Sequence, residues 1–394
     1  MRDAGATSPA EPVRAAVVGV SQAATCGVRD HAALLAHALG EEGVSCSMHW
    51  LGRSEHSLWG ARSELRAWAD ALAGELDREH PSAIVFHYSV FSYSYRGFPL
   101  YVRATLQALR RARVPVITVL HEIAYPWGRG GARGRAWSLA QNALLAEVMR
   151  ASAAVVVTAP FRAEQLASRP WLPRRETVLA PVFSNLPAPS ATRARATLSG
   201  EDHILGLFGY AYEGAASGLV LDALRLLHDR GLHVRLRLLG APGRDTPAGE
   251  AWLDGARARG IEQTLSFSGV LAAGELSDAL SACELLLHPE PSGPTSRKGT
   301  LAASLASGSA VVAIDGPRRW AELIDSEAAL VVAPTARAIA DAIAELLADE
   351  PRREALGARG NEFARTAMGV QRSAKAVAGL IERLLSEPAA RSPR

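Results

Sequence analysis

The residues best suited to chemistry lie in one loop, residues 289–300, which reads Pro-Glu-Pro-Ser-Gly-Pro-Thr-Ser-Arg-Lys-Gly-Thr. It follows an apolar segment and precedes a helical one, so backbone N–H groups and the positive end of the helix dipole favour an anion there. Arg297 can bind phosphate oxygens bidentately, and Lys298 acts as a point charge. The loop also supplies four hydroxyl groups, on Ser292, Thr295, Ser296 and Thr300. We expect a phosphate site here; the alternative is a polar loop that only caps the helix.

Two histidines lie at or near the ends of predicted strands. His121 follows the apolar residues 116–120, and His87 lies in residues 83–88. Ligands bind at the carboxyl ends of strands in α/β sheets, and a neutral imidazole can donate or accept a hydrogen bond there. We expect His121 to contact a ligand and consider His87 a second candidate, with His31 as a similar case. The alternative for each is a histidine whose hydrogen bonds are satisfied within the core.

Other candidates lie in turns of the first half. Gly27 lies in a turn of small residues that is followed by Arg29 and Asp30, which either contact a ligand or cap the next helix. Tyr93 belongs to an aromatic loop suited to stacking on a ligand ring, unless the loop packs on the surface. The basic, glycine-rich residues 128–135 form a lid, a patch for phosphate or anionic lipid, or a disordered loop.

Short apolar segments alternate with amphipathic helical segments along the chain, which predicts parallel α/β sheets. A Pro-rich stretch, residues 180–189, interrupts the alternation. The predicted strands are residues 14–20, 45–51, 83–88, 116–120, 154–158, 204–209, 234–240, 265–269, 285–288 and 310–314. The predicted helices are residues 31–41, 64–77, 100–113, 138–150, 218–230, 248–259, 275–282, 300–307, 338–349 and 371–385.

This order of elements predicts two Rossmann-like domains that face a cleft. We expect a disordered start at residues 1–12, a first domain at 13–183, a linker at 184–200 and a second domain at 201–368. Residues 369–394 would form a helix that packs back on the first domain, followed by a tail.

Composition excludes several classes of protein. The 394 residues suffice for two or three domains, and 43 Lys and Arg against 40 Asp and Glu give a net charge of +3. That balance argues against a polycationic nucleic-acid-binding tail, so we expect no nucleic-acid partner. The three scattered cysteines, Cys26, Cys46 and Cys283, are typical of a reducing cytoplasm. No segment is apolar enough for a signal peptide or a membrane span, although peripheral contact with the inner face of a membrane stays open.

A series of short motifs resembles the retaining GT-B glycosyltransferases, specifically glycosyltransferase family 4. The motifs occur in the family's order over nearly the whole chain, and none is specific alone. They are the Gly27 turn, His121-Glu122, residues 154–158, Phe208-Gly209, residues 239–243, residues 265–269, residues 305–313, Glu322 and residues 351–359.

The resemblance implies a nucleotide diphosphate-sugar donor held by the second domain and an acceptor held by the first. The acceptor would be a glycan, a glycolipid or a small molecule. By resemblance, His121, Arg297 and Lys298 are the catalytic residues, and neither a metal nor a cofactor is needed. The donor-binding residues would be Gly27, Gly209, Tyr210, Glu290, Gly293, Thr295, Ser296, Gly299, Thr300 and Glu322. The acceptor-side residues would be Arg29, Asp30, His87 and Tyr93.

The sequence departs from the family in two places. The family carries two glutamates eight positions apart, which here fall on Thr295 and Ala303, so Glu290 would have to replace one carboxylate. The family's Arg and Lys after the glycine of the second domain here fall on Tyr210 and about Ala215. Arg297 and Lys298 would then supply the missing positive charge.

Two hypotheses of different classes follow. The first is a metal-independent glycosyltransferase that retains anomeric configuration. The second is a non-catalytic GT-B-like protein that binds a sugar nucleotide or acts as a scaffold, which the two departures would explain. A third, sugar-nucleotide epimerisation, needs paired acid and base carboxylates, and we locate no such pair in the sequence.

Overall fold

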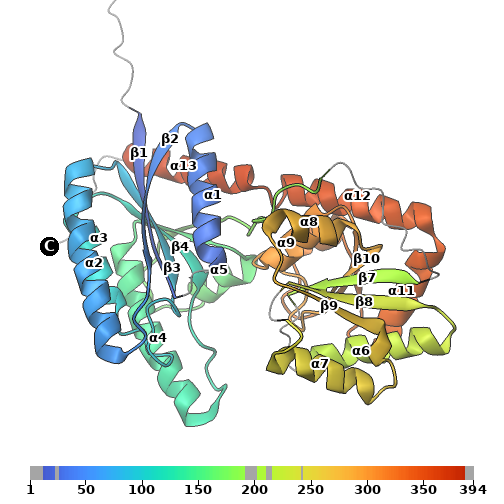
Figure 1. The fold of residues 1–394 in the computed structure, drawn as a ribbon. Coiled ribbons are helices and arrows are strands. Elements are labelled where there is room, and N and C mark those ends of the chain that lie inside the picture. Colours follow the sequence, from blue (N-terminus) through green and yellow to red (C-terminus); the bar gives the residue numbers. More distant parts are fainter. Residues whose placement is uncertain (1–11, 23–25, 191–201, 210–214, 241–242, 387–394) are drawn as a thin grey trace, which may run out of the picture. The chain divides into compact units, whose positions relative to one another are not determined.

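The computed structural model describes residues 12–22, 26–190, 202–209, 215–240 and 243–386 (Figure 1). The chain divides into two compact units. Unit 1 comprises Met1–Ala180 and Val370–Arg394, and unit 2 comprises Pro181–Gly369.

Unit 1 contains a parallel six-stranded sheet with the strand order β2-β1-β3-β4-β5-β6. Figure 1 shows α2 and α3 on one side of this sheet and α1 on the other, where α13 packs against α1. The elements of unit 1 are β1 (Val13–Ser21), α1 (Gly27–Glu41), β2 (Val44–Gly52), α2 (Leu58–Glu79), β3 (Ala83–Ser89), α3 (Val102–Arg111), β4 (Val116–Glu122), α4 (Gly131–Ala151), β5 (Ala154–Val157), α5 (Pro160–Ala167), β6 (Glu176–Leu179) and α13 (Val370–Ser386).

Unit 2 contains a second parallel six-stranded sheet with the order β12-β11-β10-β7-β8-β9. Two buried hydrophobic clusters pack against this sheet, and the helix Glu350–Thr366 contributes to both. The elements are β7 (His203–Phe208), α6 (Ala215–Asp229), β8 (Val234–Leu239), α7 (Pro247–Arg257), a 3-10 turn (Glu262–Thr264), β9 (Leu265–Gly269), α8 (Ala273–Ser281), β10 (Leu285–His288), α9 (Gly299–Ala306), β11 (Ala310–Ile314), α10 (Ala321–Asp325), β12 (Leu330–Val332), α11 (Ala336–Ala348) and α12 (Glu350–Thr366).

The α/β class and the two Rossmann-like domains predicted from the sequence are confirmed. Central strands such as β3 and β11 are buried along their whole length, as expected for parallel strands covered on both faces. Side-chain caps start several helices: the Ser57 hydroxyl accepts from the Gly60 N–H before α2, and the Thr335 hydroxyl accepts from the Ala338 N–H before α11. These caps fix where the chain turns from strand to helix.

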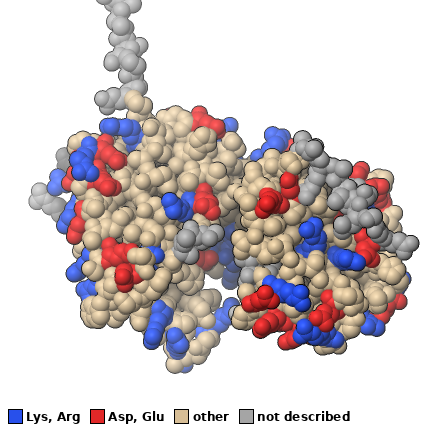
Figure 2. Space-filling model, in the orientation of Figure 1, with Lys and Arg blue, Asp and Glu red and all other residues tan. Residues whose placement is uncertain are grey.

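Each sheet has one point at which the strand order reverses, and ligands of doubly wound sheets bind at such points. In unit 1 this switch point lies between β1 and β3, and in unit 2 between β7 and β10. The carboxyl ends of these four strands are therefore where a site is expected. On the face shown in Figure 2, basic and acidic side chains are interspersed on both units, in line with the small net charge.

Candidate functional site

Three histidines meet at the switch point of unit 1. His87 lies near the end of β3, His121 near the end of β4, and His31 in the first turns of α1, which follows β1. The His31 ring centroid lies 5.2 Å from that of His121 and 5.9 Å from that of His87. His87 and His121 stack at 5.3 Å with an interplanar angle of 23°. The fold thus brings together residues that are 34 to 90 positions apart in the sequence.

A hydrogen bond joins two of these rings. His87 Nδ1 and His121 Nε2 are 3.0 Å apart. The other nitrogen of His87, Nε2, is buried and has no hydrogen-bond partner among the described residues. His121 is partly exposed, and because its Nε2 contacts His87, Nδ1 is its other ring nitrogen that a ligand could use.

Burial keeps all three rings uncharged near neutral pH. It lowers the pKa of His31 to about 4. It also lowers the pKa of His87 and of His121 well below the usual value, and the neighbouring His31 lowers both further. The Arg162 guanidinium is an additional cause at His121. A neutral imidazole with one donor and one acceptor nitrogen suits recognition of a hydroxyl-rich ligand.

Neighbouring side chains hold this histidine cluster in place. The Trp50 ring lies 6.1 Å from His87, and its Nε1 donates to the Ser21 hydroxyl over 3.2 Å. Glu122 forms a 2.9 Å ion pair with the buried Arg162 of α5. Neither Trp50 nor Arg162 was among the sequence candidates, because only the packing of β2 and α5 against the sheet brings them close.

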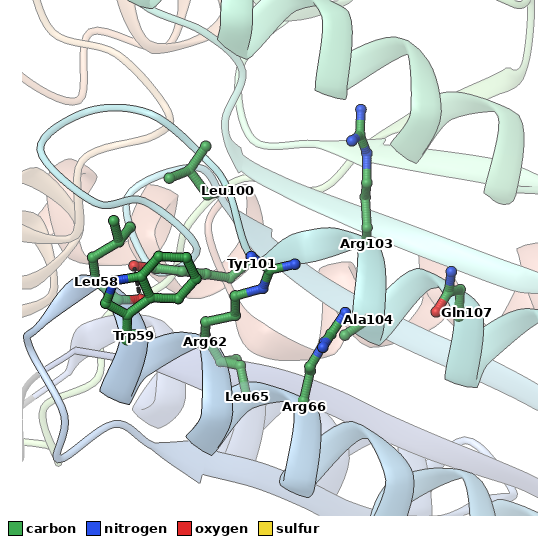
Figure 3. Close-up of a pocket in the computed structure, with 10 residues that line it drawn as sticks. All are labelled: Leu58, Trp59, Arg62, Leu65, Arg66, Leu100, Tyr101, Arg103, Ala104 and Gln107. Atoms are coloured by element: carbon green, nitrogen blue, oxygen red, sulfur yellow. Dashed lines mark hydrogen bonds between the residues drawn. The ribbon is translucent and has the colours of Figure 1, made fainter.

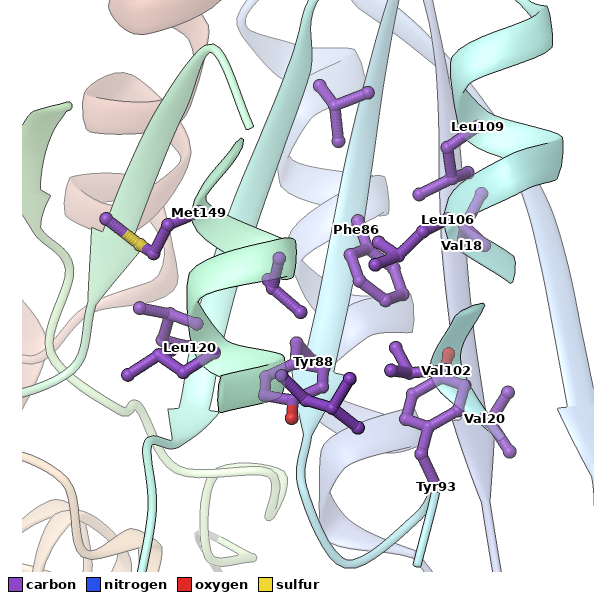
Figure 4. Close-up of a cluster of buried hydrophobic side chains, with 14 of the residues drawn as sticks. Val18, Val20, Phe86, Tyr88, Tyr93, Val102, Leu106, Leu109, Leu120 and Met149 are labelled. Atoms are coloured by element: carbon purple, nitrogen blue, oxygen red, sulfur yellow. The ribbon is translucent and has the colours of Figure 1, made fainter. Parts of the chain in front are cut away.

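The prediction that Tyr93 contacts an acceptor through an exposed ring is wrong. Tyr93 is 0% exposed, and its ring stacks on Tyr88 at 6.0 Å and packs against Phe86 at 6.1 Å. Figure 4 shows it within the core, near Val20 and Val102. The ring is large and apolar, and the loop after β3 folds inward to bury it, leaving Phe91 as the exposed aromatic.

The remaining acceptor-side and turn candidates lie at the start of α1. Gly27 begins the helix, and Arg29 and Asp30 are exposed in its first turn. The Asp30 N–H donates to the Cys26 carbonyl, which is an ordinary start of a helix. The basic residues 128–135 are not one long loop, because α4 begins at Gly131 and Arg133 stacks on Trp137 at 4.7 Å.

In unit 2, the loop after β10 carries the predicted phosphate-site residues. Lys298 is the N-cap residue of α9, and its Nζ forms a 2.5 Å ion pair with Glu290 Oε2. Glu290 also accepts a 3.0 Å hydrogen bond from the Ser292 hydroxyl. Burial alone would raise the pKa of Glu290, but the Lys298 ammonium and the Ser292 hydroxyl outweigh it, and the pKa is lowered. Glu290 and Lys298 therefore hold each other as a charged pair.

Two buried polar atoms next to this pair have no partner among the described residues. They are His288 Nε2, at the end of β10, and Thr295 Oγ1, within the loop. Burial lowers the pKa of His288 to about 4, so its ring is neutral. Unpartnered buried polar atoms are uncommon and call for an explanation, and a bound ligand is one. His288 was not among the sequence candidates, although its position at the end of a strand was a usable signal.

Glycines bring the two strand ends of unit 2 close together. Gly209, which follows β7, has a φ of +70°, and a Cβ placed there would lie 2.7 Å from Thr300 Cγ2. Gly293 has a φ of +86°, and a Cβ there would lie 2.9 Å from the Gly316 nitrogen. The structure thus brings Gly209, Thr300 and the start of α9 to one place, as a site at the β7–β10 switch point requires.

The other donor-side candidates are distributed around this loop. Gly299 begins α9, and the buried Ser296 accepts a 2.8 Å hydrogen bond at its carbonyl from the Val182 N–H. Glu322 lies exposed in the first turn of the short helix α10. Arg297 is half-buried beside Lys298. Tyr210 lies outside the described residues.

The described residues contain no group of three or more His, Cys, Asp or Glu side chains placed to hold a metal ion. Within the same part of the chain, no helix is both long and apolar enough to cross a membrane.

The comparisons with known proteins agree with this architecture. Residues 203–349 match the family model described as Glycosyl transferases group 1. Comparison with curated proteins gives no significant match.

Three solved structures show the same fold over nearly the whole chain. Sucrose-phosphate synthase from Thermosynechococcus elongatus has a TM-score of 0.68 at 16% identity, over 94% of this chain and 99% of that one. HepE of Anabaena, in complex with UDP and glucose, has a TM-score of 0.65 at 14% identity, over 93% of this chain and 99% of that one. A glycosyltransferase from Rickettsia africae has a TM-score of 0.70 at 11% identity, over 95% of this chain and 100% of that one. The chain therefore has the GT-B fold of these structures, and its residues 203–349 match the group 1 glycosyl transferases.

Proposed function

We propose that this protein is a glycosyltransferase that moves a sugar from a nucleotide diphosphate-sugar to an acceptor hydroxyl. The observation that carries the proposal is the loop between β10 and α9. It combines the N-terminus of a helix, the cations Arg297 and Lys298, and the unpartnered buried atoms of His288 and Thr295. It lies at the switch point of unit 2 and inside the matched residues 203–349.

Unit 2 would bind the donor through its diphosphate. The N–H groups of the first turn of α9 and the side chains of Arg297 and Lys298 would neutralise the charge that develops on the departing diphosphate. Gly209 and Gly293 allow the backbone to approach the phosphates closely. The structures of HepE with UDP and with UDP-glucose support a uridine diphosphate-sugar as the first donor to test.

Unit 1 would bind the acceptor and contact the transferred sugar through His121. The neutral His121 ring would form a hydrogen bond to a sugar oxygen and so hold the reacting carbon in place. In the proposed reaction the bond between the anomeric carbon and the phosphate oxygen breaks, a bond to the acceptor oxygen forms, and the proton of the acceptor hydroxyl passes to the departing diphosphate. The acceptor is a glycan, a glycolipid or a small molecule.

The stereochemical course and the cofactor requirement are further parts of the proposal. We propose retention of anomeric configuration on the resemblance to family 4. We also propose that no metal is needed, because the helix N-terminus and two cationic side chains suffice to stabilise a leaving diphosphate. Turnover should then be unchanged when a chelator is added.

The second candidate is a non-catalytic GT-B-like protein that binds a sugar nucleotide or serves as a scaffold. It is favoured by Thr295 and Ala303, which stand where the family carries glutamates, and by the ion pair that neutralises Lys298. Under this alternative the protein binds a nucleotide but transfers no sugar to any acceptor.

Calorimetric titration with UDP tests the site. The double variant Arg297→Ala, Lys298→Ala is expected to bind UDP at least tenfold more weakly than the wild type, because two charge-assisted contacts to the diphosphate are lost. The control double variant Arg337→Ala, Arg352→Ala removes two exposed arginines of the same unit and should leave binding unchanged. Unchanged UDP affinity in the first variant would show that these cations do not bind the diphosphate.

A further inference from the structure

We propose that a groove between α2 and α3 of unit 1 binds an acidic saccharide through its carboxylate or phosphate groups. The groove has a volume of about 380 Å³, and none of the site residues described above line it. Figure 3 shows Arg62 and Arg66 extending from α2 and Arg103 from α3, with Trp59 towards one end and Gln107 at the other.

The charge of the groove favours an anion. Its lining includes three arginines and no acidic side chain. Arg103 is balanced by Glu147, which lies 2.8 Å away on α4. Arg62 and Arg66 form no ion pair with any residue that the structure describes, so neither of these two guanidinium groups from one helix face is neutralised by a paired carboxylate. A guanidinium binds a carboxylate or a phosphate in a bidentate manner.

The aromatic end of the groove favours a ring rather than a bare ion. The Trp59 side chain is 70% exposed, which is unusual for so large an apolar group. The Arg62 guanidinium lies over one face of this ring, 5.7 Å from its centre, so a cation covers one face of the exposed indole. Leu100, 53% exposed, adds apolar surface from the loop before α3. An indole face suits the C–H face of a sugar, while the adjacent cation binds the acidic substituent.

The floor of the groove is well ordered by contacts with the core. Leu65 and Tyr101 are buried beneath it. The Tyr101 hydroxyl donates a 3.0 Å hydrogen bond to the Leu58 carbonyl, and its ring faces the Arg53 guanidinium at 5.3 Å. Most of the groove is thus formed by two anchored helices, which reduces the entropy lost when a ligand binds.

These features distinguish a saccharide from other anionic partners. A groove of this volume holds about two sugar rings, whereas binding to a bilayer surface needs no groove. The Gln107 amide adds a donor and an acceptor for hydroxyl groups. The inference deepens the proposed function, because an acidic saccharide bound in unit 1 would be the acceptor or part of it. Its role as acceptor rests on the proposed function, whereas its binding in the groove does not.

Calorimetry on the full chain tests the inference without turnover. The probes are tetragalacturonate and trehalose 6-phosphate, each compared with a neutral counterpart, maltotetraose and trehalose. We expect at least one acidic probe to bind at least tenfold more tightly than its neutral counterpart. The double variant Arg62→Gln, Arg66→Gln should weaken that binding at least tenfold. The single variant Trp59→Ala should also weaken it at least tenfold. The control variant Arg78→Gln, Arg110→Gln changes one exposed arginine on each of the same helices outside the groove and should bind as the wild type does.

Three outcomes would overturn the inference: no binding of either acidic probe, equal binding of the neutral sugars, or binding that the groove variants leave unchanged. Binding of phosphatidylglycerol vesicles that depends on Trp59 and Arg62, with no saccharide binding, would also overturn it in favour of a membrane surface. UDP titration of every variant shows that unit 2 is intact. It also separates a failure of the groove from a failure of the proposed donor site.

Discussion

The 3.0 Å hydrogen bond between His87 Nδ1 and His121 Nε2 determines which nitrogen of His121 carries its proton. Both rings are neutral, so one nitrogen of the pair donates and the other accepts. If His121 were the donor, the proton of His87 would lie on its buried Nε2, which has no partner among the described residues. A buried N–H without an acceptor is rarer than an unused lone pair. His87 Nδ1–H therefore donates, and the proton of His121 lies on Nδ1, the nitrogen that would face a ligand under the proposed function.

Nitrogen NMR of the histidine rings tests this arrangement. The wild-type protein should show a protonated Nδ1 and an unprotonated Nε2 at His121. His87→Leu removes the donor and should move His121 towards the Nε2–H form, with transfer reduced by up to roughly 100-fold because the ring is no longer held in position. His87→Asn keeps an N–H donor and should therefore restore much of the Nδ1–H form of His121 and much of the transfer rate. A protonated Nε2 at His121 in the wild type would contradict the assignment.

Stability should fall as the pH drops below the range in which the buried histidines are neutral. The folded-state pKa of His31 is about 4, below the ordinary value of 6.5, so the unfolded chain takes up the proton first. The stability that comes from keeping His31 uncharged is complete above pH 6.5 and is lost as the pH falls from 6.5 to about 4. Lowering the pKa of His31 from 6.5 to about 4 corresponds to roughly 3 kcal/mol of unfolding free energy. Urea unfolding of wild type and His31→Leu should diverge in pH dependence over this window, and parallel curves would refute the role of His31.

The Glu290–Lys298 pair should stabilise unit 2 above the ordinary carboxyl pKa of 4.5. Because the pKa of Glu290 is lowered, this stabilisation is lost as the pH falls through the folded-state value. Lys298→Met leaves a partly buried carboxylate without its cation and should cost about 1–3 kcal/mol at pH 7. The double variant Glu290→Gln, Lys298→Met should recover most of this loss in urea unfolding. A single variant as stable as the wild type would show that the pair is not a stabilising contact.

Gly209 and Thr300 should be energetically coupled. Gly209→Ala places a Cβ in a left-handed conformation, and 2.7 Å from Thr300 Cγ2, so a loss of about 1–3 kcal/mol is expected. Thr300→Ser removes that methyl group and should make the same substitution less costly, leaving only the backbone strain. A double-mutant cycle by urea unfolding measures the coupling. Equal costs in both backgrounds would mean that the two residues do not meet.

The sequence predicted the fold class because buried parallel strands have a strong pattern. The expected strand 83–88 is β3 (Ala83–Ser89), and the expected strand 310–314 is β11. Short elements gave too little pattern: neither α5, with 8 residues, nor β6, with 4 residues, was predicted. Helix α2 begins at Leu58, six residues before the predicted start, because the Ser57 cap extends it past the apolar periodicity.

The candidate sites were predictable only in part. His87 and His121 were found because strand ends can be read from a sequence, and so was the loop that carries Glu290 and Lys298. The contacts between these residues depend on the strand order, which sequence periodicity does not encode. Tyr93 was misassigned because the sequence does not show whether an aromatic residue in a loop is exposed or packs into the core.

The most direct test of the central claim is a thermal-shift measurement on the wild-type protein with UDP-, GDP-, ADP- and dTDP-sugars. A ligand that binds only the folded state raises the melting temperature. The account predicts a concentration-dependent rise with sugars of one nucleotide class, and this rise should be lost in the variant Arg297→Ala, Lys298→Ala. No rise with any nucleotide sugar, with or without candidate acceptors present, would contradict it.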